Sequence, residues 1–366
     1  MRRGCGCDRG CDCPRPCPHH TSLSRVQQQK LSLLGLAVHV RRQTPHPGGP
    51  VTAQQHTHTH QPGHQHDHSH SQSHDHTHSH SHSHEDIDWE AMADHLEREA
   101  EIGLPFLDEA AAWLRGLLRD SVAVTRVLDV GSGPGVATSQ LALAFPEAEA
   151  VAVDGAPKLL ERARARADAL GVGDRVTTRK AELPDDLGSL GEADLVWTGH
   201  VVHHLGDQQE ALREMGRLLR PGGVLAVVES GLNARFLPRD IGMGRPGLLA
   251  RVEATREDWF VRMRTALPGH KATVEHWPGL LAAAGLTPSG TRSFLTDIPA
   301  PVDAPVRAHL HAQLTRMRDV LTDELAADDL TVLDRLLDDD SPEGILNRPD
   351  AFYLTATTVH TARRTA

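Results

Sequence analysis

The chain has 366 residues, of which 39% are hydrophobic and 24% are charged, and its formal net charge at pH 7 is −11. Its arginines lie scattered among acidic residues, and phosphate binding draws its affinity from clustered basic residues, so we expect no nucleic-acid partner. The apolar run at residues 31–40 is about half as long as a bilayer span, so no membrane segment is expected.

The composition of residues 1–85 predicts a disordered extension. Residues 1–55 mix Cys, Arg, Pro and Gln without a helical or strand period, and Val51 is a candidate alternative start. Residues 56–84 hold 13 of the 26 histidines, alternating with Ser, Thr, Asp or Gln. Nothing in such a tract fixes a coordination geometry, so we expect adventitious binding of divalent metal there, with a physiological metal store or sensor as the alternative.

All five cysteines lie in the first 17 residues, so the rest of the chain contains no thiol, which fits a reducing cytoplasm. Residues 88–119 carry apolar side chains at three- and four-residue steps, which predicts two helices broken near Gly103 and Pro105. Strand and helix patterns then alternate, which predicts βαβ units around a parallel sheet. The expected strands are 126–130, 148–154, 175–182, 195–199 and 224–230, and the expected helices are 136–144, 156–170 and 208–219.

The last third of the chain is mainly helical in pattern. Residues 233–266 are expected to be helical around a glycine-containing loop, and further helices are expected at 277–284 and, as a pair, within 302–337. Strands are expected at 292–298 and 352–362. The helical material between these two strands is longer than a hairpin needs, so it is a candidate lid or homodimer surface, with ordinary packing as the alternative.

The most informative stretch is an apolar strand, residues 127–130, that runs directly into Gly131, Gly133 and Gly135 and is followed by Asp154. Glycines permit left-handed backbone angles and let a ligand lie against the main chain, where open α/β sheets bind ligands. A dinucleotide turn reads G-x-G-x-x-G, whereas Val136 stands where its third glycine would fall, which weakens the case for a nicotinamide dehydrogenase. The pattern indicates a bound adenosyl cofactor.

With Asp154 and the Arg220-Pro221-Gly222-Gly223 segment, this turn resembles the class I S-adenosylmethionine-dependent methyltransferases over roughly residues 120–232, and more weakly at 277–286. The resemblance implies a Rossmann-like α/β fold with a mostly parallel seven-stranded sheet, helices on both faces and an added helical cover. It implies S-adenosyl-L-methionine as the cofactor. The expected parts are a disordered extension (1–85), N-terminal helices (86–125), a cofactor-binding core (126–232) and a helical cover with the last strands (233–366).

The resemblance also implies roles for individual residues. Asp129 would hold the turn and the ammonium side of the cofactor, and Asp154 would accept both ribose hydroxyls or serve as a helix N-cap. Glu182 would meet the adenine amino group or remain a solvated strand-end residue, in which case the Leu183 backbone would read the adenine edge. The implied cofactor-binding positions are Asp129, Gly131, Ser132, Gly133, Gly135, Asp154, Gly155, Glu182, Leu183, Thr198 and His200.

Methyl transfer from a sulfonium is an in-line displacement, so much of the catalysis is positioning, and a base helps where the acceptor loses a proton. His200 and His203 are the candidate catalytic residues, with a structural role for His203 and His204 as the alternative. No Asp, Glu or Cys nearby completes a metal site with these histidines, so none is predicted.

The sequence therefore favours a methyltransferase with a small-molecule acceptor, and a protein acceptor stays open as the alternative. The rival hypotheses are a metal-binding or regulatory protein that works through its His-rich tract on a non-catalytic fold, and an oxidoreductase on a related sheet.

Overall fold

The computed structural model describes residues 92–118 and 123–365, which belong to one unit of the chain and are described by themselves. The expected disordered extension, with its cysteines and its His-rich tract, lies outside the described residues. Among the helices of the described part, none combines the length and the apolar character that crossing a bilayer requires.

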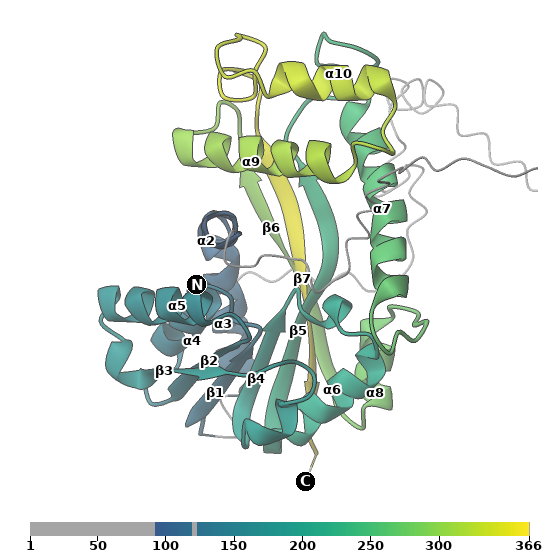
Figure 1. The fold of residues 1–366 in the computed structure, drawn as a ribbon. Helices are drawn as coiled ribbons and strands as arrows, with labels where there is room; N and C mark the ends of the chain where they lie inside the picture. The colour runs from purple at the N-terminus through teal and green to yellow at the C-terminus, as the bar shows by residue number, and fades with distance from the viewer. Residues whose placement is uncertain (1–91, 119–122, 366) are drawn as a thin grey trace, which may run out of the picture. The chain divides into compact units, whose positions relative to one another are not determined.

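A seven-stranded sheet of order β3-β2-β1-β4-β5-β7-β6 organises this unit (Figure 1). The strands β1 to β5 pair in parallel, and β7 pairs antiparallel with both β5 and β6. This confirms the mostly parallel sheet that the sequence predicts. The strands are β1 (Arg126–Val130), β2 (Glu149–Asp154), β3 (Val176–Lys180), β4 (Ala193–Gly199), β5 (Leu219–Arg235), β6 (Thr287–Ile298) and β7 (Tyr353–Arg363).

Helices cover both faces of the sheet. On one face, α3 (Leu104–Leu118) and α4 (Val136–Ala144) pack on a core that includes Trp197, and α5 (Pro157–Ala169) packs on β2 and β3. On the other face, α6 (Gln208–Arg217) and α8 (Trp277–Ala283) share a core with Leu128. Because both faces are buried, the central strands are apolar at successive positions, which is the run that predicts a parallel sheet.

Two of the last three strands, β5 and β6, extend further than the sequence predicts, whereas β7 matches the expected strand 352–362 to within one residue. β5 runs on to Arg235 and β6 begins already at Thr287, where strands were expected only at 224–230 and 292–298. Register shifts at 228–231 and 232–235 of β5, and at 288–290 of β6, absorb the glycines and the proline that interrupt the strand pattern. Pro288 lies at a register shift on β6, an edge strand, where proline is tolerated.

A separate helical layer packs at the far ends of these long strands (Figure 1). It consists of α9 (Ala304–Val320) and α10 (Ala327–Leu336), and α7 (Leu248–Ala266) runs from this layer alongside the strands; the three helices share a core with Phe236 and Tyr353. Residues 236–247 form a loop, so only the second part of the expected 233–266 helix is helical. The helices between β6 and β7 therefore use one face for ordinary packing. The short elements are α2 (Ala93–Ile102), η2 (Gly173–Arg175), η3 (Leu187–Ser189) and η4 (Val202–His204).

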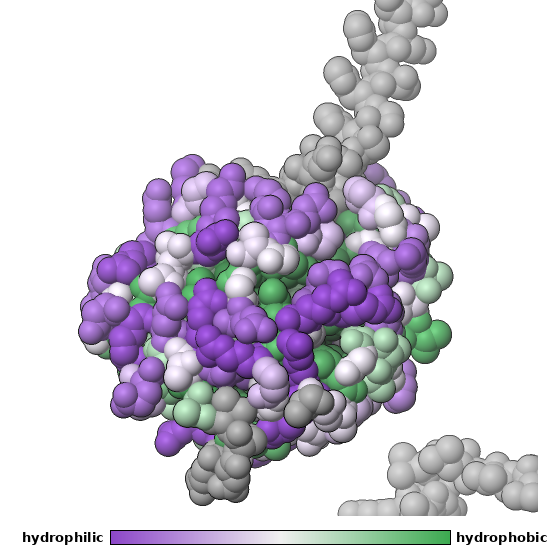
Figure 2. Space-filling view, turned by 90° about the horizontal axis from the view of Figure 1, so that it is seen from below, coloured by the Kyte–Doolittle hydropathy of each residue, from purple (hydrophilic) through white to green (hydrophobic). Residues whose placement is uncertain are grey.

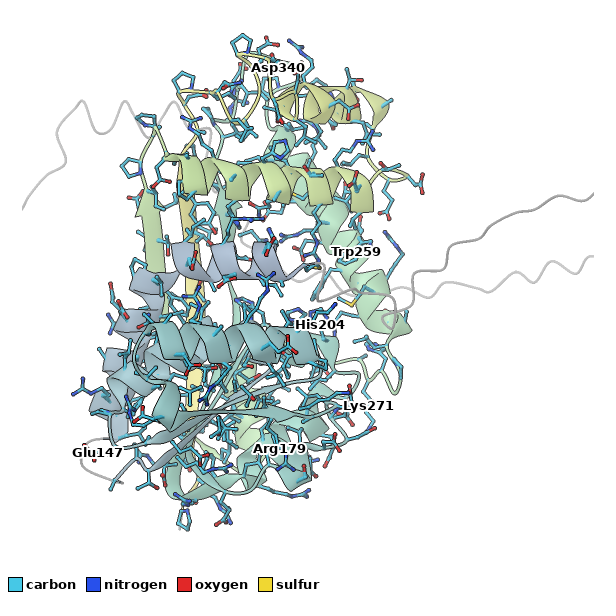
Figure 3. The ribbon with its side chains drawn as sticks, turned by 60° about the vertical axis from the view of Figure 1, so that its left-hand side comes forward. Glu147, Arg179, His204, Trp259, Lys271 and Asp340 are labelled. Atoms are coloured by element: carbon cyan, nitrogen blue, oxygen red, sulfur yellow. The ribbon has the colours of Figure 1, made fainter. Side chains whose placement is uncertain are left out.

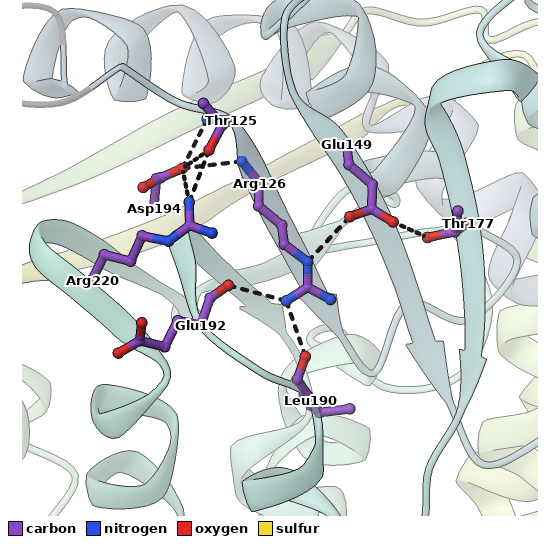
Figure 4. A network of polar contacts seen from close by, with 8 residues as sticks. All are labelled: Thr125, Arg126, Glu149, Thr177, Leu190, Glu192, Asp194 and Arg220. Atoms are coloured by element: carbon purple, nitrogen blue, oxygen red, sulfur yellow. Dashed lines mark hydrogen bonds and ion pairs between the residues drawn. The ribbon is translucent and has the colours of Figure 1, made fainter.

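The amino-terminal edge of the parallel strands is closed by a polar network around Asp194 (Figure 4). Its Oδ2 atom accepts hydrogen bonds from Thr125 N (2.8 Å), Thr125 Oγ1 (2.9 Å), Arg126 N (3.0 Å) and Arg220 Nη1 (2.9 Å). Burial opposes ionisation of Asp194, but these donors hold its pKa below the usual value.

The view of the molecule from below shows hydrophilic side chains around small hydrophobic patches (Figure 2).

Candidate functional site

The turn between β1 and α4 is built on three left-handed glycines. The φ angles of Gly131, Gly133 and Gly135 are 76°, 52° and 74°. A Cβ at Gly131 would lie 2.2 Å from Val201 Cγ2, and one at Gly135 would lie 2.4 Å from Ala163 Cβ, whereas one at Gly133 would meet nothing within 4 Å. Packing therefore requires the outer two glycines, while the middle one borders open space, as the backbone of a ligand site does.

Asp154, at the end of β2, ties this turn to the next helix. Its Oδ2 accepts from Gly133 N (2.9 Å) and its Oδ1 accepts from Ala156 N (2.9 Å). The N-cap of α5 is Ala156 rather than Asp154. Burial raises the pKa of Asp154, although the backbone donors act against this shift. Each oxygen of an ionised carboxylate accepts about two hydrogen bonds, so both retain capacity for a ligand hydroxyl.

Asp129 lies beneath the turn with only 2% of its surface exposed. Its Oδ2 accepts a 2.6 Å hydrogen bond from Thr138 Oγ1 on α4, a partner that sequence reasoning did not identify. Burial raises the pKa of Asp129 to about 7, against the effect of the Thr138 hydrogen bond. A cation bound nearby would favour the ionised form of this carboxyl group.

Two hydroxyl groups at the ends of β1 and β4 are buried without a partner. Ser132 and Thr198 are 8% and 1% exposed, and neither Ser132 Oγ nor Thr198 Oγ1 makes a hydrogen bond. Thr198 pairs with Val130, so it lies beside the start of the glycine turn. Buried polar groups are normally satisfied, so these two oxygens fit a site whose ligand supplies the partners.

The expected adenine end lies beside the ribose-binding position. A Cβ at Gly155 would lie 3.1 Å from Glu182 Oε2, so the Glu182 carboxylate approaches the Gly155 backbone. Glu182 is exposed, its Oε1 lies 3.4 Å from Lys180 Nζ, and its backbone N donates to Asp186 Oδ2 at 2.8 Å. Leu183 packs against the core under α6. The structure therefore brings Gly155, Glu182 and Leu183 to the same edge as Asp154.

His200 directly follows β4 and takes a left-handed conformation, with φ 56°. Its backbone N donates to Val228 O at 3.0 Å, and the residue is exposed. A left-handed conformation is uncommon for a non-glycine residue and directs the chain out of the strand and into η4. The strand-end location of His200 that the sequence predicts is therefore present.

His203 pairs with a buried carboxylate. Its Nδ1 lies 2.8 Å from Glu229 Oε2, and its backbone N lies 3.4 Å from Glu229 Oε1. Glu229 is 4% exposed, and although burial opposes ionisation, the His203 hydrogen bond holds its pKa below the usual value. With Nδ1 donating to the carboxylate, Nε2 becomes the proton acceptor of the ring. Sequence reasoning missed Glu229. This residue lies on β5 beside the end of β4, much as Asp154 lies at the end of β2.

The segment around His203 is fixed by α7. Arg264 donates to the carbonyl oxygens of His203 and Leu205, and the Phe260 ring centroid lies 5.4 Å from that of His203. His204, labelled in Figure 3, donates from its backbone N to Val201 O at 2.8 Å and packs its ring 4.2 Å from that of His203. The described residues contain no group of three or more His, Cys, Asp or Glu arranged to hold a metal ion.

Comparison with known proteins connects this edge of the sheet to a family. Residues 128–225, from β1 into β5, match the family model described as "Methyltransferase domain". The chain is 37% identical over 102 residues to trans-aconitate 2-methyltransferase of Methylobacterium radiotolerans, covering 27% of this chain and 36% of the relative. It is 34% identical over 146 residues to malonyl-[acyl-carrier protein] O-methyltransferase of Dechloromonas aromatica, covering 37% and 50%.

The alignments thus span about a third to a half of the length of these two relatives. Among solved structures, the YcgJ protein of Bacillus subtilis matches with 19% identity and a TM-score of 0.39, covering 69% of this chain and 98% of that one.

Proposed function

We propose that this chain, whose residues 128–225 carry a methyltransferase domain, transfers a methyl group from S-adenosyl-L-methionine to a small-molecule acceptor. One observation carries the proposal: at the turn after β1, Gly133 borders open space while its N–H is held by Asp154. A main chain without side chains beside an anchored carboxylate suits a ligand that presents a sugar diol. The buried hydroxyls of Ser132 and Thr198, which have no hydrogen-bond partner, lie beside the same turn.

The residues present fit the parts of this cofactor. Asp154 would accept the ribose hydroxyls, Glu182 or the Leu183 backbone would meet adenine, and Asp129 would face the cationic methionine end. When bound, S-adenosylmethionine supplies an electrophilic methyl group on a sulfonium. Asp129 is the residue whose charge responds to that cation, because its carboxyl group titrates near neutrality.

His203 is the proposed general base, with Glu229 as its positioning residue. The acceptor oxygen or nitrogen would take the methyl group that the bound donor supplies, and His203 Nε2 would take the proton that this acceptor atom loses. The ionised Glu229 stabilises the resulting imidazolium and orients the ring through Nδ1. His200, exposed at the end of β4, would contact the cofactor or the acceptor.

Calorimetry with S-adenosylhomocysteine tests the cofactor part of the proposal. We expect a dissociation constant on the order of micromolar, weakened about hundredfold in Asp154→Ala because two charge-assisted hydrogen bonds are lost. Asp185→Ala, an exposed carboxylate near the same edge, is the matched control and should bind as the unaltered chain does. No heat of binding to either the donor or its spent product would contradict the proposal.

Methyl transfer itself needs an acceptor, which incubation with labelled donor and fractionated cell extract would supply. With that fraction, His203→Ala should lower turnover by about 10²–10⁴-fold, with unchanged affinity for S-adenosylhomocysteine. Glu229→Gln should shift the pH profile, because the imidazolium loses its ionised partner. His311→Ala, which removes a surface ion pair with Asp339, is the control. Unchanged turnover of His203→Ala at every pH would remove this residue from the mechanism.

A small-molecule acceptor fits the acidic chain, and the absence of cysteine after residue 17 fits a cytoplasmic setting.

The His-rich tract supports a separate proposal, adventitious binding of divalent metal, because alternating imidazoles offer many interchangeable ligands. The enzyme proposal predicts that removing residues 1–84 leaves S-adenosylhomocysteine binding unchanged. Tight stoichiometric metal binding that alters cofactor affinity would instead favour a regulatory role for the tract.

A further inference from the structure

A cavity of about 420 Å³ lies on the sheet face that carries α6 and α8, beside the N-terminus of α8. This volume lies within the range of small-molecule sites. None of its lining residues belongs to the proposed cofactor site. The walls come from three strands and from the segment that leads into α8, and they include Leu232, Trp277, Ala356, Glu275, Ser293 and His360.

The register of the long strands explains the apolar wall. Leu232 on β5 and Leu295 on β6 both pair with Ala356 on β7, so the three side chains form a row on one face, of which Leu232 and Ala356 line the cavity. Leu232 is 47% exposed and Leu295 is 63% exposed. Apolar side chains in a contiguous row that remain open to solvent mark an interaction surface, and the cavity beside them fits a small molecule.

His360 gives this wall a polar point. It is 7% exposed, its Nδ1 lies 3.2 Å from Thr291 Oγ1, and its ring also lies within hydrogen-bonding reach of the Glu229 backbone. Burial lowers the pKa of His360, and the hydrogen bond to the Glu229 backbone and the Glu229 charge oppose this shift without reversing it. The Trp277 ring stacks beside it at 6.3 Å. An imidazole next to an indole suits a ligand with a hydroxyl on an apolar body.

The cavity adjoins the proposed base. Gly231 lines it and follows Glu229 by two residues on β5. Arg264, which donates to His203 O, interacts electrostatically with both Glu229 and the cavity residue Glu275. The same charges therefore act on the cavity wall and on the His203–Glu229 pair.

The segment that carries Glu275 is anchored to the loop after η4. Gln208 Nε2 donates to Glu275 Oε1 at 3.1 Å, and Lys271 N donates to Gly206 O at 3.0 Å. Lys271, labelled in Figure 3, also pairs its Nζ with Asp207 Oδ2 at 2.5 Å. The wall of the cavity is thus held in place relative to η4, which carries His203.

The charges of the wall select against anions. Of the described residues that line the cavity, none is Lys or Arg, and Glu275 contributes a carboxylate. A polycarboxylate such as trans-aconitate would meet no cation here and would be repelled by Glu275. We infer, on the basis of the proposed methyl transfer, that this cavity holds the body of the acceptor, and that the acceptor is an uncharged, mainly apolar molecule with a hydroxyl group.

The test uses 2-naphthol as an uncharged probe and trans-aconitate as an anionic one, each titrated onto the protein saturated with S-adenosylhomocysteine. Ala356→Phe fills the cavity, and Leu232→Trp blocks it from a half-exposed position where the core is not disturbed. Ala282→Phe adds the same ring as the first variant on the exposed side of α8 and is the control. Calorimetry with S-adenosylhomocysteine checks each variant separately.

We expect 2-naphthol to bind the unaltered chain and Ala282→Phe equally, and at least tenfold more weakly to both cavity variants, while trans-aconitate does not compete. Both cavity variants should also lose at least tenfold in kcat/KM with the acceptor fraction and keep their affinity for S-adenosylhomocysteine. Absence of 2-naphthol binding, binding that the variants do not alter, or turnover that survives in them would overturn the inference. If the unaltered chain does not bind S-adenosylhomocysteine, the result would instead contradict the proposed function.

Discussion

The two edges of the parallel sheet are built in opposite ways. At the amino-terminal edge, one oxygen of Asp194 accepts four hydrogen bonds and the pKa of this carboxyl group is held low. At the carboxyl edge, burial raises the pKa of both Asp129 and Asp154, and the hydroxyls of Ser132 and Thr198 have no partner. The neighbouring strands β1 and β4 thus begin at a polar group whose hydrogen bonds are made and end beside hydroxyl groups that have no partner.

The difference separates stability from binding. A buried carboxylate that is fully paired stabilises the folded chain, and removing it leaves its donors unsatisfied. A carboxyl group that is buried with spare acceptor capacity costs stability until a ligand completes it. Substitutions at the two edges should therefore have separable effects on folding and on ligand binding.

The largest effect is expected at the amino-terminal edge. Asp194→Ala should lower the free energy of unfolding by about 3 kcal/mol, because two backbone N–H groups and Arg220 lose a buried acceptor. Affinity for S-adenosylhomocysteine should stay unchanged where the variant is folded. Glu149→Ala is the control from the same network, since this carboxylate is exposed and should cost less than about 1 kcal/mol. Urea unfolding measures both, and equal losses would show that the network is not organised around Asp194.

The reverse outcome is expected at Gly133. Gly133→Ala adds a methyl group that meets no protein atom within 4 Å, so only the left-handed backbone costs stability, by about 1 kcal/mol. Its affinity for S-adenosylhomocysteine should fall by about hundredfold, because the methyl group enters the space left for a ligand. Gly171→Ala has a similar φ of 71° and the same free surroundings but lies away from the edge. Gly171→Ala should lose as much stability as Gly133→Ala and keep its full affinity for S-adenosylhomocysteine. If calorimetry found that both variants lose this affinity, the prediction would be wrong.

The backbone of the carboxyl edge is the part of the structure that the sequence predicts well. Gly131, Gly133 and Gly135 all take left-handed conformations, as their spacing after an apolar strand predicts, while their contact with a cofactor stays a prediction. The location of Asp154 is also predictable, because the carboxyl ends of neighbouring parallel strands lie at the same edge of the sheet. Pairing in the sheet core is equally predictable, since successive apolar residues on β1 and β4 reflect burial on both faces.

Side-chain pairs from distant segments are not predictable in this way. His203 was a candidate from its strand-end location, but its partner Glu229 is 26 residues away and only the fold brings them together. The cavity joins Leu232 to His360 through the register of β5 and β7, and β5 extends past its expected end at residue 230. A β-bulge has no strong signal in one sequence, so the length of β5 and the wall that it forms escaped prediction.

Asp129 gives a smaller, pH-dependent test of the comparison. Its pKa of about 7 means that the free protein holds a proton at pH 6, which must leave before the carboxylate can pair with a cation. Affinity for S-adenosylmethionine should therefore rise about tenfold from pH 6 to pH 8 through this group. In the ligand-free protein the sign is opposite: the folded state binds more protons than the unfolded state above pH 4, so stability from this group falls as pH rises to 7. Asp129→Asn should flatten both profiles, and an unchanged slope would exclude Asp129 as their source.

The smallest effect is expected where α2 is tied to α5, the helix that begins directly after the carboxyl edge. Glu97 pairs with Arg162 Nη1 at 3.1 Å and with Arg166 Nη2 at 2.7 Å, and all three side chains are partly exposed. Glu97→Gln should therefore cost less than about 1 kcal/mol of stability, and the loss should disappear at 1 M salt, where such pairs are screened. Glu147→Gln, an exposed residue labelled in Figure 3 outside these ion pairs, is the control. A salt-independent loss of several kcal/mol in thermal unfolding would mean that α2 belongs to the hydrogen-bonded, stabilising part of the molecule rather than to the edge that we propose binds the cofactor.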